Sequence, residues 1–272
     1  MVVQSGTLIH YPESDGQPMT ESDPTRDYLV YCVEALELFF RSRQQVYVSG
    51  NLFIYYEEGN PKAAVSPDVF VVFGVSKRKR RTYKTWEEGG KVPAFVMEIT
   101  SRTTKRQDEN TKPQLYASLG VQEYFQYDPT GDYLTPQLKG ATLVNGQYQP
   151  LPLQELPDGT YVFSSAVLGL DVCLPVPDEM LLNLVGDKPP RSLRFYDPKT
   201  GERFLSYAES IEARNQQRER AEQAQERAKQ AEQAQRAAVP KLLALGMPPE
   251  QVADTLGLSL EAVNRTVGDA NP

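Results

Sequence analysis

The sequence predicts an α/β fold, in which a mixed β-sheet core is flanked by helices and followed by a β extension and a long C-terminal helix. Helix-like and strand-like stretches occur in the order helix, three strands, helix and strand, which is typical of a sheet with helices on its faces. The third strand-like stretch is almost wholly apolar, as in a strand buried on both faces. Beyond about residue 209 the composition becomes Ala, Glu, Gln, Arg and Lys, which favours a long helix.

The first helix is predicted from Asp23 to about Arg43. Asp23 can cap the helix and Pro24 suits its first position, while Leu29 and Val33 begin an apolar face. Strands are then expected at residues 45–56, 64–74, 92–100 and 121–129.

The second helix is expected between the last two strands, from about Asn110 to Leu119. Gly120 is suited to the position after its end. Proline is tolerated only in the first turn of a helix, so Pro113 requires a start near Asn110.

Composition divides the chain into four parts, which are an arm at 1–22, a main domain with its β extension at 23–206, an Ala/Glu/Gln/Arg-rich helix at 207–238 and a small tail at 239–272. The alanines of the helix recur in three- and four-residue steps, which favours either a weak coiled coil or a lone solvated helix. Alanine buries little area, so pairing through it alone would be weak.

The tail has the spacing of a helix-turn-helix. Ala253 is small where two helices would touch, Gly257 suits the turn, and Val263 would hold the second helix. The presumed recognition helix offers Asn264 and Arg265 but few other groups that could read bases. DNA reading and a packing or dimerisation role are therefore both open for this tail.

Composition also excludes several classes of protein. The 272 residues include two cysteines and one histidine, which argues against a disulfide framework, a zinc site or a Ser-His-Asp triad. There is no signal-peptide pattern and no apolar run long enough to span a membrane, so a reduced, cytoplasmic protein is expected. The net charge of −7 argues against a strong nonspecific grip on DNA.

One basic cluster stands out against this acidic composition. It comprises Lys77, Arg78, Lys79, Arg80, Arg81 and Lys84. Such a run is either a solvated loop or a loop that contacts nucleic-acid phosphates.

Two acidic residues and a lysine have the pattern expected of a metal-dependent site. Asp68 and Glu98 lie in stretches that read as apolar strands, where a charge is costly unless it is paired or holds a metal. Lys112 shares a helix face with Leu115 and Leu119, so it would face the sheet and need a carboxylate partner. Mg²⁺ is often held by one or two carboxylates with water and phosphate oxygens.

These residues lie within stretches, "SPDVFVVF" and "VMEITSRTTKRQDENTKPQLYASLGVQEYFQYDP", that resemble a restriction-endonuclease-like family of the PD-(D/E)xK nuclease superfamily. In that family a glutamate is followed by a Ser/Thr-rich turn, an acidic residue, a lysine and a tyrosine. Here these are Glu98, the 101–104 turn, Asp108, Lys112 and Tyr116. The likeness covers about residues 20–175.

The resemblance implies a metal-dependent DNA endonuclease. Asp68, Glu98 and the backbone carbonyl of Ile99 would hold Mg²⁺ or Mn²⁺, and Lys112 would orient water or offset charge on the phosphate. Candidate accessory residues are Glu21, Glu34, Thr100 and Asp108. A two-fold dimer would present one site to each DNA strand.

Two features depart from the superfamily motif. Thr100 occupies the position where the lysine usually stands, two residues after the glutamate, so the charge must come from Lys112. A start near Asn110 would place Lys112 in the first turn, where the helix dipole slightly disfavours a cation.

The alternative function is a catalytically inactive module of the same fold that binds DNA or protein and oligomerises through its helical tail. A purely structural protein would leave Glu98 unexplained. The preferred target and the biological role, whether restriction, repair or a mobile element, are open at this point.

Overall fold

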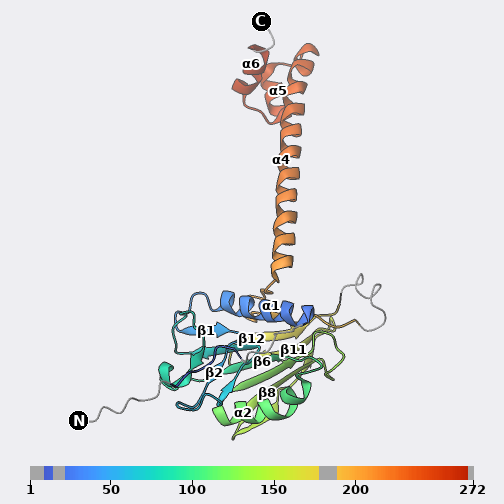
Figure 1. Ribbon diagram of the computed structural model, residues 1–272. Coiled ribbons are helices and arrows are strands. Elements are labelled where there is room, and N and C mark those ends of the chain that lie inside the picture. The colour runs from blue at the N-terminus through green and yellow to red at the C-terminus, as the bar shows by residue number, and fades with distance from the viewer. Residues whose placement is uncertain (1–8, 15–21, 178–188, 269–272) are drawn as a thin grey trace, which may run out of the picture. The chain divides into compact units, whose positions relative to one another are not determined.

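The computed structural model describes residues 9–14, 22–177 and 189–268, and the chain divides after Ser206 into two units (Figure 1). A six-stranded mixed sheet forms the centre of the first unit, in the order β1 (Val46–Ser49), β4 (Val69–Phe73), β6 (Phe95–Ile99), β7 (Glu123–Tyr127), β8 (Leu138–Val144) and β9 (Gln147–Pro150). β6 and β7 are parallel, and all other neighbours are antiparallel. The predicted mixed sheet is confirmed.

Helix α1 (Asp23–Phe39) covers one face of this sheet. Ser22 caps it, because its hydroxyl accepts a hydrogen bond from the amide of Thr25; Asp23 is the first helical residue, so the expected cap was one residue off. The side chains of Cys32 and Leu36 are fully buried against the sheet.

A second, antiparallel sheet packs on the same face as α1. It consists of β10 (Gln154–Glu155), β11 (Tyr161–Ser165), β12 (Leu170–Leu174) and β13 (Arg194–Tyr196). Phe163, Val172 and Phe195 share a core with Met97 and Phe125 of the main sheet. The predicted β extension therefore covers the sheet only in part, since β8 and β9 continue the main sheet itself.

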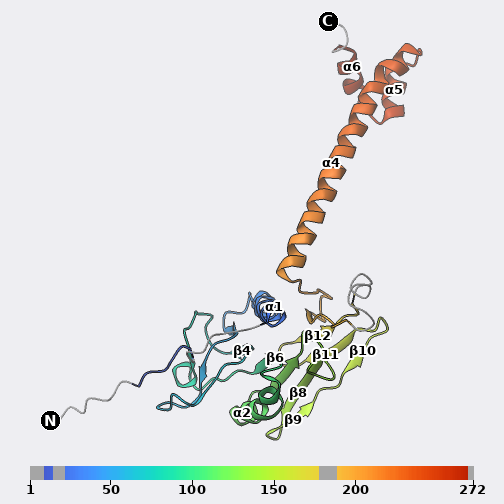
Figure 2. The ribbon, with the colours of Figure 1, turned by 45° about the vertical axis from the view of Figure 1, so that its right-hand side comes forward.

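The opposite face is covered by α2 (Lys112–Leu119), as Figure 2 shows. A small sheet of β3 (Ala64–Val65), β2 (Ile54–Tyr55) and β5 (Tyr83–Lys84) shares the core on this side, and the short 3₁₀ helix η1 (Thr85–Glu88) follows β5. Residues 45–56 and 64–74 were each expected to form one strand. Each stretch instead divides between this sheet and the main sheet.

The second unit begins with α4 (Tyr207–Ala244), which continues past residue 238 with Pro240 inside it. α5 (Pro249–Leu256) and α6 (Leu260–Gly268) pack on its C-terminal part around Val239 and Val252. Ala253 and Val263 are buried and Gly257 has a φ of 65° at the turn, as the helix-turn-helix spacing predicts. Arg265, the main base-reading candidate, is paired with Glu261.

Candidate active site

The structure brings Asp68, Glu98 and Lys112 together on the face of the sheet that α2 covers. Glu98 is fully buried, and its Oε2 accepts a hydrogen bond of 2.8 Å from Lys112 Nζ. Asp68 lies just before β4, one position beyond the Val69–Met97 pair, and is therefore beside Glu98. Its Oδ2 accepts a hydrogen bond of 2.7 Å from the amide of Ile99.

Strand alternation explains why Glu98 faces α2. Side chains at alternate positions of a strand point to opposite faces. In β6, Phe95, Met97 and Ile99 belong to the core under α1, while Val96 belongs to the core under α2. Glu98 therefore points to the same side as Val96.

A π-helical turn, η2 (Gln107–Thr111), places Lys112 above Glu98. The amide of Lys112 donates to the carbonyl of Gln107, five residues back, and this wider turn carries the chain past Pro113, which has no amide to donate. The helical segment already begins at Lys105. The start of α2 at Lys112 is within two residues of the expected start near Asn110, but helical turns precede it, so Lys112 does not lie at the free N-terminal end of a helix.

Two further side chains complete the buried cluster. Tyr116, one turn beyond Lys112, donates its hydroxyl to Glu98 Oε1 at 2.5 Å. Asp108, one turn before Lys112, is fully buried and lies 2.9 Å from Lys112 Nζ. Apart from this ion pair, neither carboxylate oxygen of Asp108 has a hydrogen-bond partner among the described residues. Lys112 therefore lies between two buried carboxylates.

Burial controls the protonation of this cluster. Burial raises the pKa of Glu98 to about 8, with Lys112 opposing the shift and Asp68 adding to it. Burial also raises the pKa of Asp68 to about 6, opposed by Lys112 and by the Ile99 amide. For Lys112, burial alone would lower the pKa, but the charges of Glu98, Asp108 and Asp68 outweigh it, and its pKa is raised.

Gly50 fixes the position of Asp68, a role that sequence reasoning missed. A Cβ atom at Gly50 would overlap the backbone carbonyl oxygen of Asp68 and approach Val33 to 3.1 Å. The neighbouring amide of Asn51 donates to the carbonyl of Pro67 at 3.0 Å. Only a residue without a side chain lets the two segments approach this closely.

A cleft of about 360 Å³ opens beside Asp68. Hydroxyl groups dominate its lining, which includes Ser22 and Thr25 of the α1 start, Thr100, Ser101 and Arg102. The hydroxyl of Thr100 is buried and lacks a hydrogen-bond partner within the described part of the chain.

The four residues predicted to have accessory roles lie in different parts of the structure. Thr100 lines the cleft, and Asp108 belongs to the buried cluster. Glu34 is exposed on α1 and is not among the residues that line the cleft, so its accessory role stays a prediction. Glu21 lies outside the described residues.

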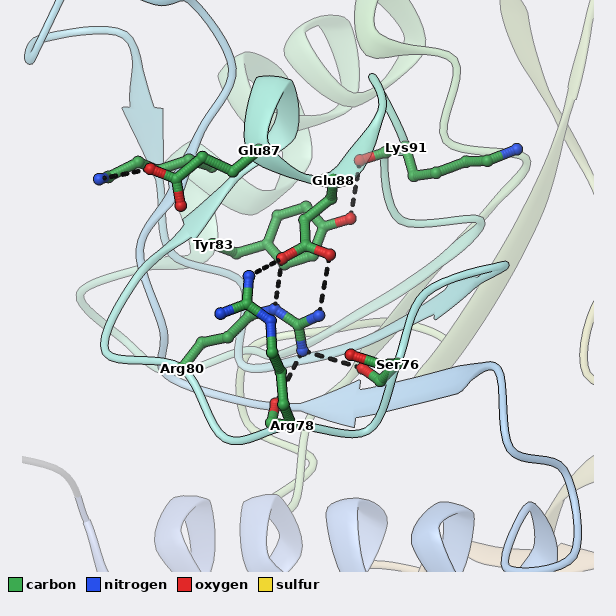
Figure 3. Close-up of polar contacts among 8 residues, drawn as sticks. Ser76, Arg78, Arg80, Tyr83, Glu87, Glu88 and Lys91 are labelled. Atoms are coloured by element: carbon green, nitrogen blue, oxygen red, sulfur yellow. Dashed lines mark hydrogen bonds and ion pairs between the residues drawn. The ribbon is translucent and has the colours of Figure 1, made fainter.

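The six cations of the basic loop all have partners within the protein. Arg78 and Arg80 both contact Glu88, as Figure 3 shows, and the guanidinium of Arg80 also lies 4.3 Å from the centre of the Tyr47 ring. The remaining contacts are Lys79 with Glu37, Arg81 with Glu13, Lys84 with Glu87, and Lys77 with the carbonyls of Phe40 and Arg41. A phosphate would have to compete with these acceptors, so the loop does not have the free cations expected of a nucleic-acid contact.

The donor set fits a hard divalent cation. No group of three or more His, Cys, Asp or Glu side chains arranged to hold a metal occurs in the described ranges. Mg²⁺ does not need three, because one or two carboxylates suffice when water and phosphate oxygens supply the rest. Each oxygen of Glu98 accepts one hydrogen bond, from Lys112 or Tyr116, and a carboxylate oxygen has a second lone pair.

The chain was compared with family models, curated proteins and solved structures. A model of the Uma2 family, described as "Putative restriction endonuclease", matches residues 6–178, which include Asp68, Glu98 and Lys112. The chain is similar to a solved structure described as a putative nuclease belonging to DUF820 from Anabaena variabilis ATCC 29413, with 13% identity, a TM-score of 0.36, and coverage of 52% of this chain and 75% of that chain. No curated protein matches.

We predict that Glu98→Gln stabilises the metal-free protein increasingly, relative to the wild type, as the pH rises from about 5 to about 8. Between pH 4.5, the pKa of the carboxyl in the unfolded chain, and about 8, its pKa in the folded protein, Glu98 binds a proton only in the folded state. The free energy of unfolding of the wild type therefore falls as the pH rises through this range, and glutamine, which does not titrate, removes that loss. Urea denaturation in a chelator measures the difference at each pH. Glu34→Gln, at an exposed site, is the control and should show no such trend; a pH-independent effect of Glu98→Gln would contradict the prediction.

We also predict that Gly50→Ala lowers both stability and Mg²⁺ affinity, because the added methyl group must displace Asp68. Gly140→Ala is the matched control, since its Cβ would lie 2.6 Å from the Phe125 ring, in the other core. Both changes should cost about 1–3 kcal/mol of stability. Only Gly50→Ala should weaken Mg²⁺ binding, by about 10-fold or more, as measured by calorimetry. Equal Mg²⁺ affinities in the two variants would show that Gly50 does not position the site.

Proposed function

The chain belongs to the Uma2 family of restriction-endonuclease-like proteins, and from this premise we propose that it is a metal-dependent endonuclease that hydrolyses DNA phosphodiester bonds. The observation that carries the proposal is the placement of Glu98. A fully buried glutamate beside Asp68, with a lysine on one oxygen and a tyrosine on the other, is costly for folding unless it serves a site.

Each residue has a role in this proposal. Asp68, Glu98 and the carbonyl of Ile99 would hold Mg²⁺ or Mn²⁺. The bound cation would supply polarisation of the scissile phosphate and a lowered pKa for water. Tyr116 holds the Glu98 carboxylate in orientation through its 2.5 Å hydrogen bond. Asp108 holds Lys112 in place from the other side.

Lys112 is suited to stabilise charge on the reacting phosphate. An ammonium has three donor hydrogens, and two carboxylates, those of Glu98 and Asp108, lie within 2.9 Å of it. One donor is left for water or a phosphate oxygen. Such a preorganised donor typically contributes about 10²–10³ in rate.

We predict that the wild type nicks or linearises supercoiled plasmid only when Mg²⁺ or Mn²⁺ is present. Asp68→Ala and Glu98→Ala should abolish cleavage, while Glu34→Ala, which removes an exposed acid, should cleave normally. Lys112→Ala should lower the rate by about 10²-fold or more but keep Mg²⁺ binding in calorimetry. Loss of Mg²⁺ binding in Lys112→Ala would indicate a structural lysine, and plasmid left intact by the wild type would favour the inactive module of the same fold.

The homodimer expected from double-strand cleavage stays a proposal. The middle of α4, residues 212–237, is exposed throughout, and its alanines bury too little area for strong pairing. Sedimentation velocity of the full chain at micromolar concentrations measures the state directly. A concentration-dependent shift toward twice the monomer mass would support the dimer, and a single species of monomer mass would contradict it.

No helix in the described part of the chain is both long and apolar enough to cross a membrane.

A further inference from the structure

Three exposed cationic side chains without an ion pair to any described residue lie beside the candidate site, and they do not belong to the basic loop. Arg102, Lys105 and Arg106 are exposed, and none of their side chains makes an ion pair or hydrogen bond within the described residues. They follow Glu98 and Ile99 closely in the chain, and Arg102 lines the cleft beside Asp68. The six loop cations, in contrast, are all engaged.

Local backbone structure sets these three cations on one face. The amide of Lys105 donates to the carbonyl of Ser101, and the amide of Asp108 to that of Thr104, so the chain is already helical here. Residues three and four positions apart on a helix share a face. Arg102, Lys105 and Arg106 therefore lie together on the outer side, while Asp108 points inward to Lys112.

The cleft offers hydrogen-bond donors to an anion. Its lining contains hydroxyls from the α1 start, from the 101–104 turn and from Thr130. Among them the hydroxyl of Thr100, which is 1% exposed as a residue, is buried and unpartnered within the described residues. A buried donor without a partner is unusual in a folded protein and indicates a group that is satisfied by something other than the chain itself.

We propose that Arg102, Lys105 and Arg106, with the hydroxyl-lined cleft, bind the DNA backbone phosphates next to the scissile one. This inference rests on the proposed function and deepens it, because it names the surface that holds the substrate. The chemistry is that of phosphodiester oxygens, which accept hydrogen bonds from guanidinium, ammonium and hydroxyl groups. It also gives an acidic chain a local means of holding DNA, since three exposed cations lie together beside the site.

The test is DNA binding measured without cleavage. Binding of a fluorescent duplex to the full chain is followed by anisotropy in Ca²⁺ or in chelator, between about 50 and 200 mM salt. The variant is Arg102→Ala/Lys105→Ala/Arg106→Ala. The control, Arg78→Ala/Lys79→Ala/Arg81→Ala, removes the same number of charges from exposed cations that have acidic partners.

The site variant should bind the duplex at least 10-fold more weakly, and its salt slope should fall by about 0.9 for each phosphate that is no longer neutralised, or about 2.7 for three. The control should keep most of the wild-type slope. Equal weakening in the two variants would overturn the inference, as would a wild type that binds no duplex. A wild type that binds DNA through these cations but cleaves nothing with Mg²⁺ would contradict the proposed nuclease and leave this inference supported.

As a finer check, Thr100→Val keeps the shape of the side chain but removes its hydroxyl. Weaker binding with an unchanged salt slope is expected, because a neutral donor releases no counterion. Unchanged affinity in Thr100→Val would remove Thr100 from the binding surface.

Discussion

The ammonium group of Lys112 is the charge on which the buried site depends. It lies 2.8 Å from Glu98 and 2.9 Å from Asp108, and both of these carboxylates are fully buried. Without a cation between them they would repel each other in a low-dielectric interior. The π-helical turn that precedes Lys112, and the parallel pairing of β6 with β7 that buries Glu98, both serve this contact.

The contact also leaves the site ready for a metal. Lys112 offsets only part of the cost of burying Glu98, so the pKa of Glu98 is raised to about 8. A divalent cation would compete with that proton, and it would bring charge that Lys112 alone does not supply. Binding a divalent cation would therefore offset the unfavourable free energy of burying the two carboxylates.

The sequence was sufficient for the central features of the site and insufficient for its surroundings. An apolar run interrupted by Glu98 predicts a buried acid on one face of a strand, and helical spacing predicts that Lys112 faces it. The division of residues 45–56 between two sheets could not be predicted, because it places Gly50 against the backbone of Asp68, a contact that the local residue pattern does not show. The ion pairs of Arg78 and Arg80 with Glu88 could not be predicted either, because the folded backbone brings Glu88 to these arginines.

The most direct measurement is a crystal structure of the full chain grown with Mn²⁺, with anomalous diffraction recorded at the manganese edge. An anomalous peak between the Asp68 and Glu98 carboxylates, within bonding distance of the Ile99 carbonyl, is the predicted result. An ordered site with Lys112 still on Glu98 and no manganese beside Asp68, at a concentration that supports binding in solution, would contradict the account.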